Sequence, residues 1–428
     1  MTESDDWRDS VIPKAADEAD HVIRSFREAP DGGKEIKVVP ANAGIGHLYA
    51  EGEILVREEH LDRVLEILEP GAERDASRIR RIIDGVALLT LGEPQPLALD
   101  AIDAIDQQLG QGIATPNHVL TVAGGQPTIC PATEPQEVYY DIEPFPSMCH
   151  DGGGDGVLVY MADTGLLRDA ATHSWLHGVR MANPLEDADP KEPLQGDPPQ
   201  ITPYTGHGTF VAGVLRCIAP NTEILVENAF AIAGSELEAD LVPRLDAALV
   251  LSPDIFHLTI ACTSRNDLPL IAFQEWLRKV RQQGGVCIAA AGNSGIDRKV
   301  WPAAFPGVIS VGALGGDWRG RANFSNFGSW VDVYAPGRDL INAFATGTYK
   351  CHVYPYADDP PRKFYGMAKW SGTSFSTPIV TGLIASRMSR TGETARQAAA
   401  ALLAEARAQA IPGVGPVLLP AGYPLQPR

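Results

Sequence analysis

Four short segments of the chain carry polar side chains that could act together in acyl transfer. Asp163 ends the apolar run VLVYMA, His207 opens HGTFVAG, Asn293 lies in AAAGNSG and Ser374 lies in GTSFSTP. Histidine is the side chain whose ordinary pKa suits proton transfer near neutrality. A serine, a histidine base, a carboxylate that orients the base and an amide donor for an oxyanion form a minimal set for nucleophilic catalysis.

Each segment also has a plainer structural explanation. Asp163 precedes a Thr-Gly turn, Asn293 lies in a Gly-flanked loop, and His207 could be a structural histidine at the mouth of a buried helix. Three hydroxyl residues compete with Ser374 as simple helix caps: Ser371, Thr373 and Ser376. The catalytic interpretation therefore depends on the segments occurring together, in the chain order Asp, His, Asn, Ser.

Secondary-structure signals place these residues at ends of elements. Apolar residues at helical spacing after Pro378 predict a helix that begins beside Ser374, with the proline in its first turn, where an N–H has no intrahelical acceptor. The free N–H groups and the positive dipole end of such a terminus stabilise an anion. Asp163 follows an apolar strand, and open α/β sheets bind ligands at the carboxyl ends of their strands.

The pattern of apolar runs predicts two folded units. From residue 156, runs such as GVLVYMADTG and GVCIAAAGNSG alternate with helices, which predicts an α/β fold with a doubly wound, mostly parallel sheet. Before it, strands at 53–56, 86–91 and 118–122 and helices at 61–68 and 98–109 predict a small α+β domain of the split βαβ type.

These signals divide the chain into four parts. We expect a flexible leader at residues 1–35, a small domain at 36–123, a Pro- and Gly-rich linker at 124–150 and a large domain at 151–428. Residues 183–203 are acidic and Pro-rich and predict a solvent-exposed insertion.

Composition excludes several classes of function. The net charge of −19 over 428 residues argues against a nucleic-acid partner. No apolar run reaches membrane-spanning length, and no secretory signal is visible, so we expect a cytoplasmic protein with no membrane partner, while non-standard export stays open. The six cysteines lack metal-site spacing, so we expect free thiols and no metal or cofactor, although an even count leaves disulfides open.

On these motifs the chain resembles the subtilase family, the subtilisin-like serine proteases, over roughly residues 156–415. Its segments VYMADTG, HGTFVAG, AAAGNSG and GTSFSTP are similar to the family's motifs in the same order. The resemblance implies that Asp163 orients the base, His207 is the general acid and base, and Ser374 is the nucleophile. Asn293 would donate to the oxyanion together with the backbone N–H of Ser374.

The resemblance also implies a role for the N-terminal part. Subtilases are made with a split βαβ propeptide that assists folding and blocks the cleft, so residues 36–123 would be an intramolecular inhibitor, removed by self-cleavage in the linker. Thr259, Ile260 and Ala261 correspond to the family's substrate-binding strand, and the methyl group of Ala261 would narrow the first specificity pocket. The family's strongest calcium loop has no room before Ala219.

The function expected from the sequence is that of a serine endopeptidase, made as a self-processed zymogen, that forms an acyl-enzyme on a restricted set of intracellular proteins or peptides. The alternative is a latent or non-catalytic binding protein on the same fold, with the N-terminal domain as a permanent partner. An esterase of the α/β-hydrolase type is disfavoured by the chain order and by the absence of a Gly-x-Ser-x-Gly elbow.

Overall fold

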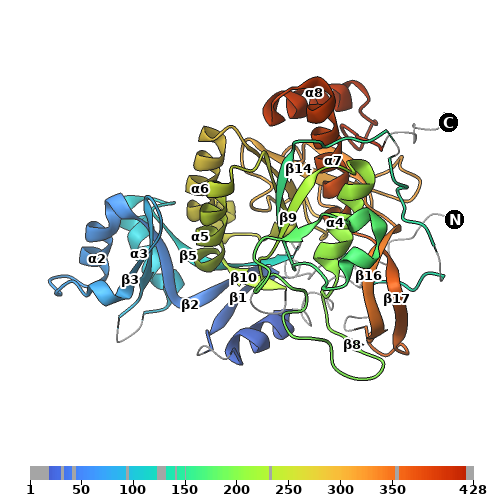
Figure 1. Cartoon of the computed structure of the whole chain (residues 1–428). Helices are drawn as coiled ribbons and strands as arrows, with labels where there is room; N and C mark the ends of the chain where they lie inside the picture. Colours follow the sequence, from blue (N-terminus) through green and yellow to red (C-terminus); the bar gives the residue numbers. More distant parts are fainter. Residues whose placement is uncertain are drawn as a thin grey trace.

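A computed structural model describes residues 19–29, 33–40, 45–92, 96–122, 132–139, 142–149, 151–230, 234–351 and 356–420. In these residues the strands form three sheets. A small lobe made by the N-terminal elements lies at one side of a larger lobe, with α5 and α6 facing it (Figure 1).

The large lobe is built on a parallel sheet of seven strands, in the order β15-β14-β13-β11-β6-β9-β7. The bounds are β6 Leu158–Asp163, β7 Arg180–Met181, β9 Glu223–Asn228, β11 Ile255–Leu258, β13 Val286–Ala290, β14 Val308–Leu314 and β15 Val333–Pro336. These strands are mostly buried, as expected of a sheet covered on both faces. The predicted doubly wound α/β fold is confirmed.

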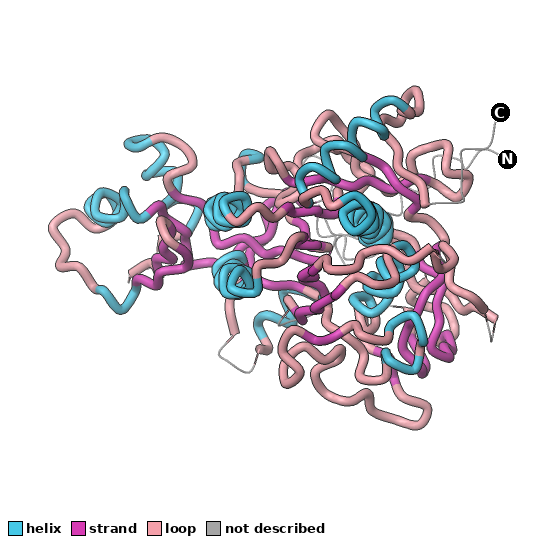
Figure 2. Tube along the Cα trace, turned by 45° about the horizontal axis from the view of Figure 1, so that its top comes forward, coloured by secondary structure: helices cyan, strands magenta, loops and turns pink. Residues whose placement is uncertain are grey.

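Helices cover both faces of this sheet, as Figure 2 shows. One face carries α4 (His207–Ile218), α7 (Thr373–Thr391) and α8 (Ala395–Ala408), and the other carries α5 (Glu238–Ala248) and α6 (Ile271–Gln282). A Cβ atom at Gly382 would lie 2.7 Å from Cβ of Ile218, so the glycine lets α7 approach α4 closely. None of the helices in the described ranges is long and apolar enough to span a bilayer.

The small lobe has two more strands than expected. Its elements are β1 (Ile36–Pro40), β2 (Ile45–Arg57), α2 (Leu61–Leu68), β3 (Ile79–Ile83), β4 (Val86–Thr90), α3 (Ala98–Leu109) and β5 (Ala114–Val122). The predicted strand at 53–56 is the end of the longer β2. The strand β3 was not predicted, because the two exposed arginines in its sequence, IRRII, interrupt the apolar run.

Two other expectations differ from the structure. Residues 19–27 form a helix in which Val22 and Phe26 are buried, so this part of the predicted flexible leader is ordered by apolar contacts. Residues 1–18 lie outside the described residues. The predicted insertion is exposed at 184–186, 191–193 and 195–198, as expected, but Asp187 and Asp189 within it are only 5% exposed each, and their carboxylates accept hydrogen bonds from the large lobe.

Strand β5 joins the two lobes. Its first residues pair with β2, and its last residues pair antiparallel with two short strands of the large lobe, β10 (Ser235–Leu237) and β12 (Ile260–Ala261). Thr121 lies opposite Ser235 on one side and Ala261 on the other. The last strand of the small lobe therefore continues into the large lobe as the middle of a three-stranded ladder.

The described parts of the predicted linker also contact the large lobe. A third sheet has the order β17-β16-β8, with bounds Arg362–Trp370, Leu340–Tyr349 and Gln200–Ile201. Gln136 forms a bridge with Lys369 of β17, and Phe145 forms one with Ile341 of β16. Backbone hydrogen bonds thus hold two residues of the predicted linker, Gln136 and Phe145, against this sheet.

Candidate active site

Asp163 is the last residue of β6 and is fully buried. Its Oδ1 accepts hydrogen bonds from Nδ1 of His207, at 2.6 Å, and from the backbone N–H of Thr164, at 2.7 Å, while Oδ2 accepts from Oγ1 of Thr259, at 2.5 Å. Burial alone would raise the pKa of the Asp163 carboxyl, but the charge of His207 and these hydrogen bonds outweigh burial and lower it. The carboxylate is therefore held ionised beside the imidazole.

His207 is the first residue of α4, so its position depends on how that helix starts. Gly206 precedes it with φ at 84°, a left-handed conformation that glycine adopts without strain. A Cβ atom at Gly208 would lie 2.3 Å from the carbonyl oxygen of Gly165 and 3.2 Å from Oδ1 of Asp163. Glycines on both sides of His207 thus allow the helix terminus to approach the end of β6.

Ser374 lies in the first turn of α7, directly after Thr373. The prediction that Pro378 occupies the first turn is wrong, because the helix already begins at Thr373 and the proline falls one turn later. The prediction that Ser374 lies at a helix N-terminus is confirmed. Phe375 brings this turn against the base, since its ring centroid is 5.2 Å from that of His207.

Within the described part of the chain, two buried polar side-chain atoms at this place lack a hydrogen-bond partner: Nε2 of His207 and Oγ of Ser374. Buried polar atoms without a partner are rare and require an explanation. A hydroxyl and an imidazole nitrogen are also the pair that a serine nucleophile and its base require, and such hydrogen bonds are often long until substrate is bound. The unpaired atoms are therefore compatible with a reactive serine.

Asn293 follows β13 and is held by the start of α7. Its Oδ1 accepts from the backbone N–H of Thr373, at 2.8 Å, and from Oγ1 of the same residue, at 3.0 Å. Asn326 braces the loop, because its Oδ1 accepts from the N–H of Ser294, at 3.0 Å, and its Nδ2 donates to the carbonyl of Ala291, at 2.8 Å. These two bonds fix the carbonyl oxygen of the Asn293 amide at Thr373, so Nδ2 is the donor end of the amide.

The three residues predicted to bind substrate lie next to this centre. Ile260 and Ala261 form β12 and pair with Val122 and Thr121 of β5. Thr259, one residue earlier, donates to Asp163 and so also supports the carboxylate. The strand edge to which the sequence assigns substrate binding is thus paired with the chain's own N-terminal lobe.

Sequence reasoning missed several residues that support the site. Thr164 and Thr373 stand inside the quoted motifs, where their hydroxyls could have been recognised as bracing groups. Asp189 carried no sequence signal, since it lies in a stretch that looks solvated. Burial raises the pKa of the Asp189 carboxyl to about 7, and this effect is larger than the lowering by the hydrogen bonds from Thr164 and Gly206.

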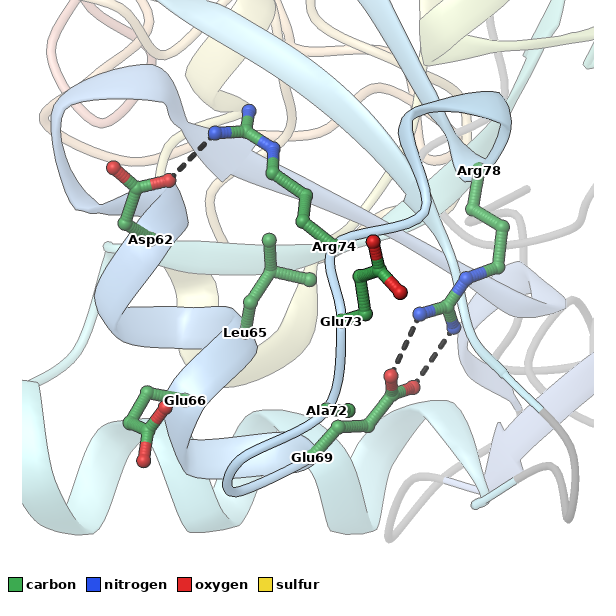
Figure 3. Close-up of a pocket in the computed structure, with 8 residues that line it drawn as sticks. All are labelled: Asp62, Leu65, Glu66, Glu69, Ala72, Glu73, Arg74 and Arg78. Carbon is green, nitrogen blue, oxygen red and sulfur yellow. Dashed lines mark hydrogen bonds and ion pairs between the residues drawn. The ribbon is translucent and has the colours of Figure 1, made fainter.

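A pocket in the small lobe does not belong to this site (Figure 3). Its charged groups largely satisfy one another, since Arg78 donates to both carboxylate oxygens of Glu69 and Arg74 pairs with Asp62. The lining residues are Asp62, Leu65, Glu66, Glu69, Ala72, Glu73, Arg74 and Arg78. The pocket contains none of the candidate catalytic residues.

Comparison with known proteins identifies the family. A family model described as the subtilase family matches residues 154–415. The chain is similar to a thermophilic serine proteinase of Bacillus sp. (strain AK1), 31% identical over 42% of this chain and 41% of that protein. It is also similar to an intracellular serine protease of Paenibacillus polymyxa, 28% identical over 56% of this chain and 69% of that protein. The chain belongs to the subtilase family.

A solved structure agrees with this assignment at the level of the fold. Fervidolysin from Fervidobacterium pennivorans, described as a keratinolytic enzyme related to subtilisin, has a TM-score of 0.59 and 18% identity over 91% of this chain and 63% of that chain. The similarity of fold therefore extends beyond the segment that the family model matches. The chain spans less than half the length of the Bacillus relative. The assignment to the family applies to residues 154–415, which the family model matches.

Proposed function

We propose that this protein is a serine endopeptidase in which Ser374 is the nucleophile, His207 the general acid and base, and Asp163 the carboxylate that orients the base. The observation that carries the proposal is the buried His207, which is bonded to Asp163 through Nδ1 while Nε2 has no partner in the described residues and the first turn of α7 lies against its ring. Membership of the subtilase family supports the same reaction.

In the proposed reaction, Oγ of Ser374 attacks the carbonyl carbon of a peptide bond while Nε2 of His207 takes the hydroxyl proton. Asp163 keeps Nδ1 protonated and stabilises the imidazolium. The C–N bond then breaks, His207 returns the proton to the leaving amine, and water releases the acyl group by the reverse sequence of transfers. Asn293 Nδ2 and the N–H of Ser374 donate to the oxygen that becomes negative.

The test of this proposal is whether the purified chain cuts itself. A fluorophosphonate reacts with an activated serine hydroxyl, so it should label the protein and block conversion of the full chain into shorter products. A chain that stays intact with time and takes no label would favour the latent or binding protein instead.

We expect Asn293→Ala to slow peptide hydrolysis by about 100- to 1,000-fold, because one oxyanion donor is lost. The change should lower kcat with little effect on KM, since the donor acts mainly in the transition state. Asn326→Ala is a control for loop disruption, because Asn326 braces the same loop without facing the oxyanion. Equal kcat in Asn293→Ala and wild type would remove Asn293 from the mechanism.

We further propose that residues 36–123 are an inhibitory propeptide whose last strand occupies the substrate cleft. Support comes from β5, which pairs with β10 and with the predicted substrate-binding strand β12. Downstream of residues 123–131, which the structure does not describe, Trp370 donates from Nε1 to the carbonyl of Thr133, at 2.7 Å, and its ring centroid lies 5.7 Å from that of His207. We therefore propose that self-cleavage occurs between Val122 and Ala132.

Leu120 gives a test of the inhibitor. Its side chain is fully buried in the apolar cluster that contains Leu258 and Ile260, so Leu120→Ala should weaken the hold of the cleaved N-terminal fragment. A loss of about 2–3 kcal/mol corresponds to roughly 30- to 150-fold weaker binding. The measurement is the lag before full peptidase activity after self-cleavage, which should shorten. The control is Leu97→Ala, because Leu97 is 55% exposed. Equal lags in Leu120→Ala and Leu97→Ala would contradict cleft occupation.

One relative suggests where the protein acts. The Paenibacillus polymyxa relative is named an intracellular serine protease, and we propose the same location for this chain on that similarity alone. Fractionation of cells that produce the protein would check it, and enzyme found only in the medium would contradict it.

A further inference from the structure

Asp189 is a buried carboxylate that the proposed reaction does not use. It lies in the segment between β7 and β8, within the acidic, Pro-rich stretch that the sequence suggested to be solvated. The structure instead turns this residue inward, where it is 5% exposed. Ionisable side chains are rarely buried to this degree unless they make hydrogen bonds.

Asp189 is hydrogen-bonded to a chain neighbour of Asp163 and to a chain neighbour of His207, the two residues that we call the dyad. Its Oδ2 accepts from Oγ1 of Thr164, at 2.7 Å, and from the backbone N–H of Gly206, at 2.8 Å. Thr164 directly follows Asp163, and Gly206 directly precedes His207. One carboxylate oxygen therefore fixes the end of β6 and the start of α4 at the same point.

Thr164 completes this connection. Its Oγ1 accepts from the N–H of Gly208, at 3.0 Å, and its own N–H donates to Oδ1 of Asp163, at 2.7 Å. The start of α4 is therefore held on both sides of His207, by Asp189 at the preceding residue and by Thr164 at the following one. The N-cap residue of this helix, Gly206, has no side chain that could accept a hydrogen bond, so the contacts from Thr164 and Asp189 stand where a capping residue would normally fix the terminus.

We propose that Asp189 is a positioning residue for the Asp163–His207 pair, supplied by the acidic insertion. Its carboxylate accepts hydrogen bonds from Thr164 and Gly206, the chain neighbours of the pair, and none of its hydrogen bonds in the described residues goes to a reacting atom or to β10 or β12. This inference rests on the proposed function, because it assumes that the pair serves Ser374. If the acceptor is removed, the buried N–H of Gly206 and the hydroxyl of Thr164 both lose their partner, which is costly, and the helix start can shift to reach another one. A shift on the order of 1 Å in a catalytic group can slow a reaction about 100-fold.

The test compares two substitutions at position 189. Asp189→Ala removes the acceptor and should slow the first-order self-cleavage of the purified full chain by about 100-fold. Asp189→Asn keeps an oxygen that can accept both hydrogen bonds and should stay within about threefold of wild type. After processing, with active sites counted by fluorophosphonate titration, Asp189→Ala should lower kcat and leave KM nearly unchanged.

Asp187→Ala is the matched control. Asp187 lies in the same insertion and is equally buried, and its carboxylate accepts from the N–H groups of Asn183 and Asn228. Asn228 lies opposite Asp163 on the neighbouring strand β9, but the hydrogen bonds of the Asp187 carboxylate do not go to Thr164 or Gly206, the two residues that Asp189 holds. This variant should lose thermal stability while its self-cleavage rate stays within about threefold of wild type, because the hydrogen bonds that it removes affect folding and leave the dyad in place.

A second site keeps the inference testable if Asp189→Ala fails to fold. Thr164→Val preserves the volume and removes the hydroxyl that links Asp189 to Gly208, so it should slow self-cleavage by roughly 10-fold or more, whereas Thr164→Ser should not. The inference is overturned if Asp189→Ala or Thr164→Val cleaves at the wild-type rate, or if Asp189→Asn is as slow as Asp189→Ala. Failure of wild type itself to cleave would instead reject the proposed function.

Discussion

Ser374→Ala is expected to abolish self-cleavage of the full chain, with a loss of about 10,000-fold or more in rate. Oγ of Ser374 is the atom that we propose forms the covalent bond to the substrate. It is fully buried, has no hydrogen-bond partner in the described residues, and belongs to the turn whose Phe375 packs against His207. The substitution removes one oxygen atom and creates little space, so the fold should be retained. The measurement is the rate at which the full-length band disappears on a denaturing gel.

Ser376→Ala is a closely matched control for this experiment. Ser376 lies in the same helix two residues later and is equally buried, but its Oγ donates to the carbonyl of Thr373, at 3.0 Å, as a local hydrogen bond within the helix. We expect this variant to cleave itself close to the wild-type rate. If Ser374→Ala were processed as fast as Ser376→Ala, another residue would have to be the nucleophile.

Asp163→Asn is expected to lower kcat by about 10,000-fold. The carboxylate accepts the hydrogen bond from Nδ1 of His207, and an amide at this position can present N–H to Nδ1 instead. The imidazole would then carry its proton on Nε2, where it cannot accept the proton of the serine. The fluorophosphonate reaction should slow in parallel, because it requires the same activated hydroxyl.

Asp187→Asn controls for the isosteric loss of a buried charge. It makes the same chemical change in a carboxylate that is 5% exposed and whose hydrogen bonds come from the N–H groups of Asn183 and Asn228 and not from His207. We expect the kcat of Asp187→Asn to stay within about threefold of wild type.

A kcat for Asp163→Asn within about tenfold of wild type would show that Asp163 does not orient the base.

The sequence was sufficient for the parts of the site that local pattern determines. Apolar runs predicted the parallel sheet, and the ends of those runs predicted where Asp163 and Asn293 would lie, because the carboxyl ends of parallel strands meet at one edge. The small residues after His207 predicted the buried helix α4. The start of α7 was predicted in place, although Pro378 was assigned to the wrong turn because Thr373 and Ser374 look like loop residues.

The parts that could not be predicted depend on long-range contacts. Asp189 appears solvated in the sequence, since acidic and proline residues surround it, and only the fold brings its carboxylate to Thr164 and Gly206. The helix at residues 19–27 is stabilised by burial of Val22 and Phe26 against other elements. Its many charged residues gave no indication of this burial. Pairing of β5 with β10 and β12 joins residues more than a hundred positions apart, and no local pattern specifies such a ladder.

The two lobes suggest what controls the enzyme that we propose. The last strand of the small lobe lies between β10 and β12, and Thr133 and Gln136 are bound to Trp370 and Lys369 on β17. Cleavage between Val122 and Ala132 would free the two ends without breaking either set of contacts. On this account, the rate of activation depends on how fast the cleaved strand leaves, and not on the cleavage alone.

Mass-spectrometric mapping of a fluorophosphonate adduct on the processed enzyme tests whether Ser374 is the nucleophile. We expect a single adduct on the peptide that contains GTSFSTP, assigned to Ser374 by fragmentation, and no adduct in Ser374→Ala. An adduct on Ser371, Ser376 or a residue elsewhere, or equal labelling of wild type and Ser374→Ala, would contradict it.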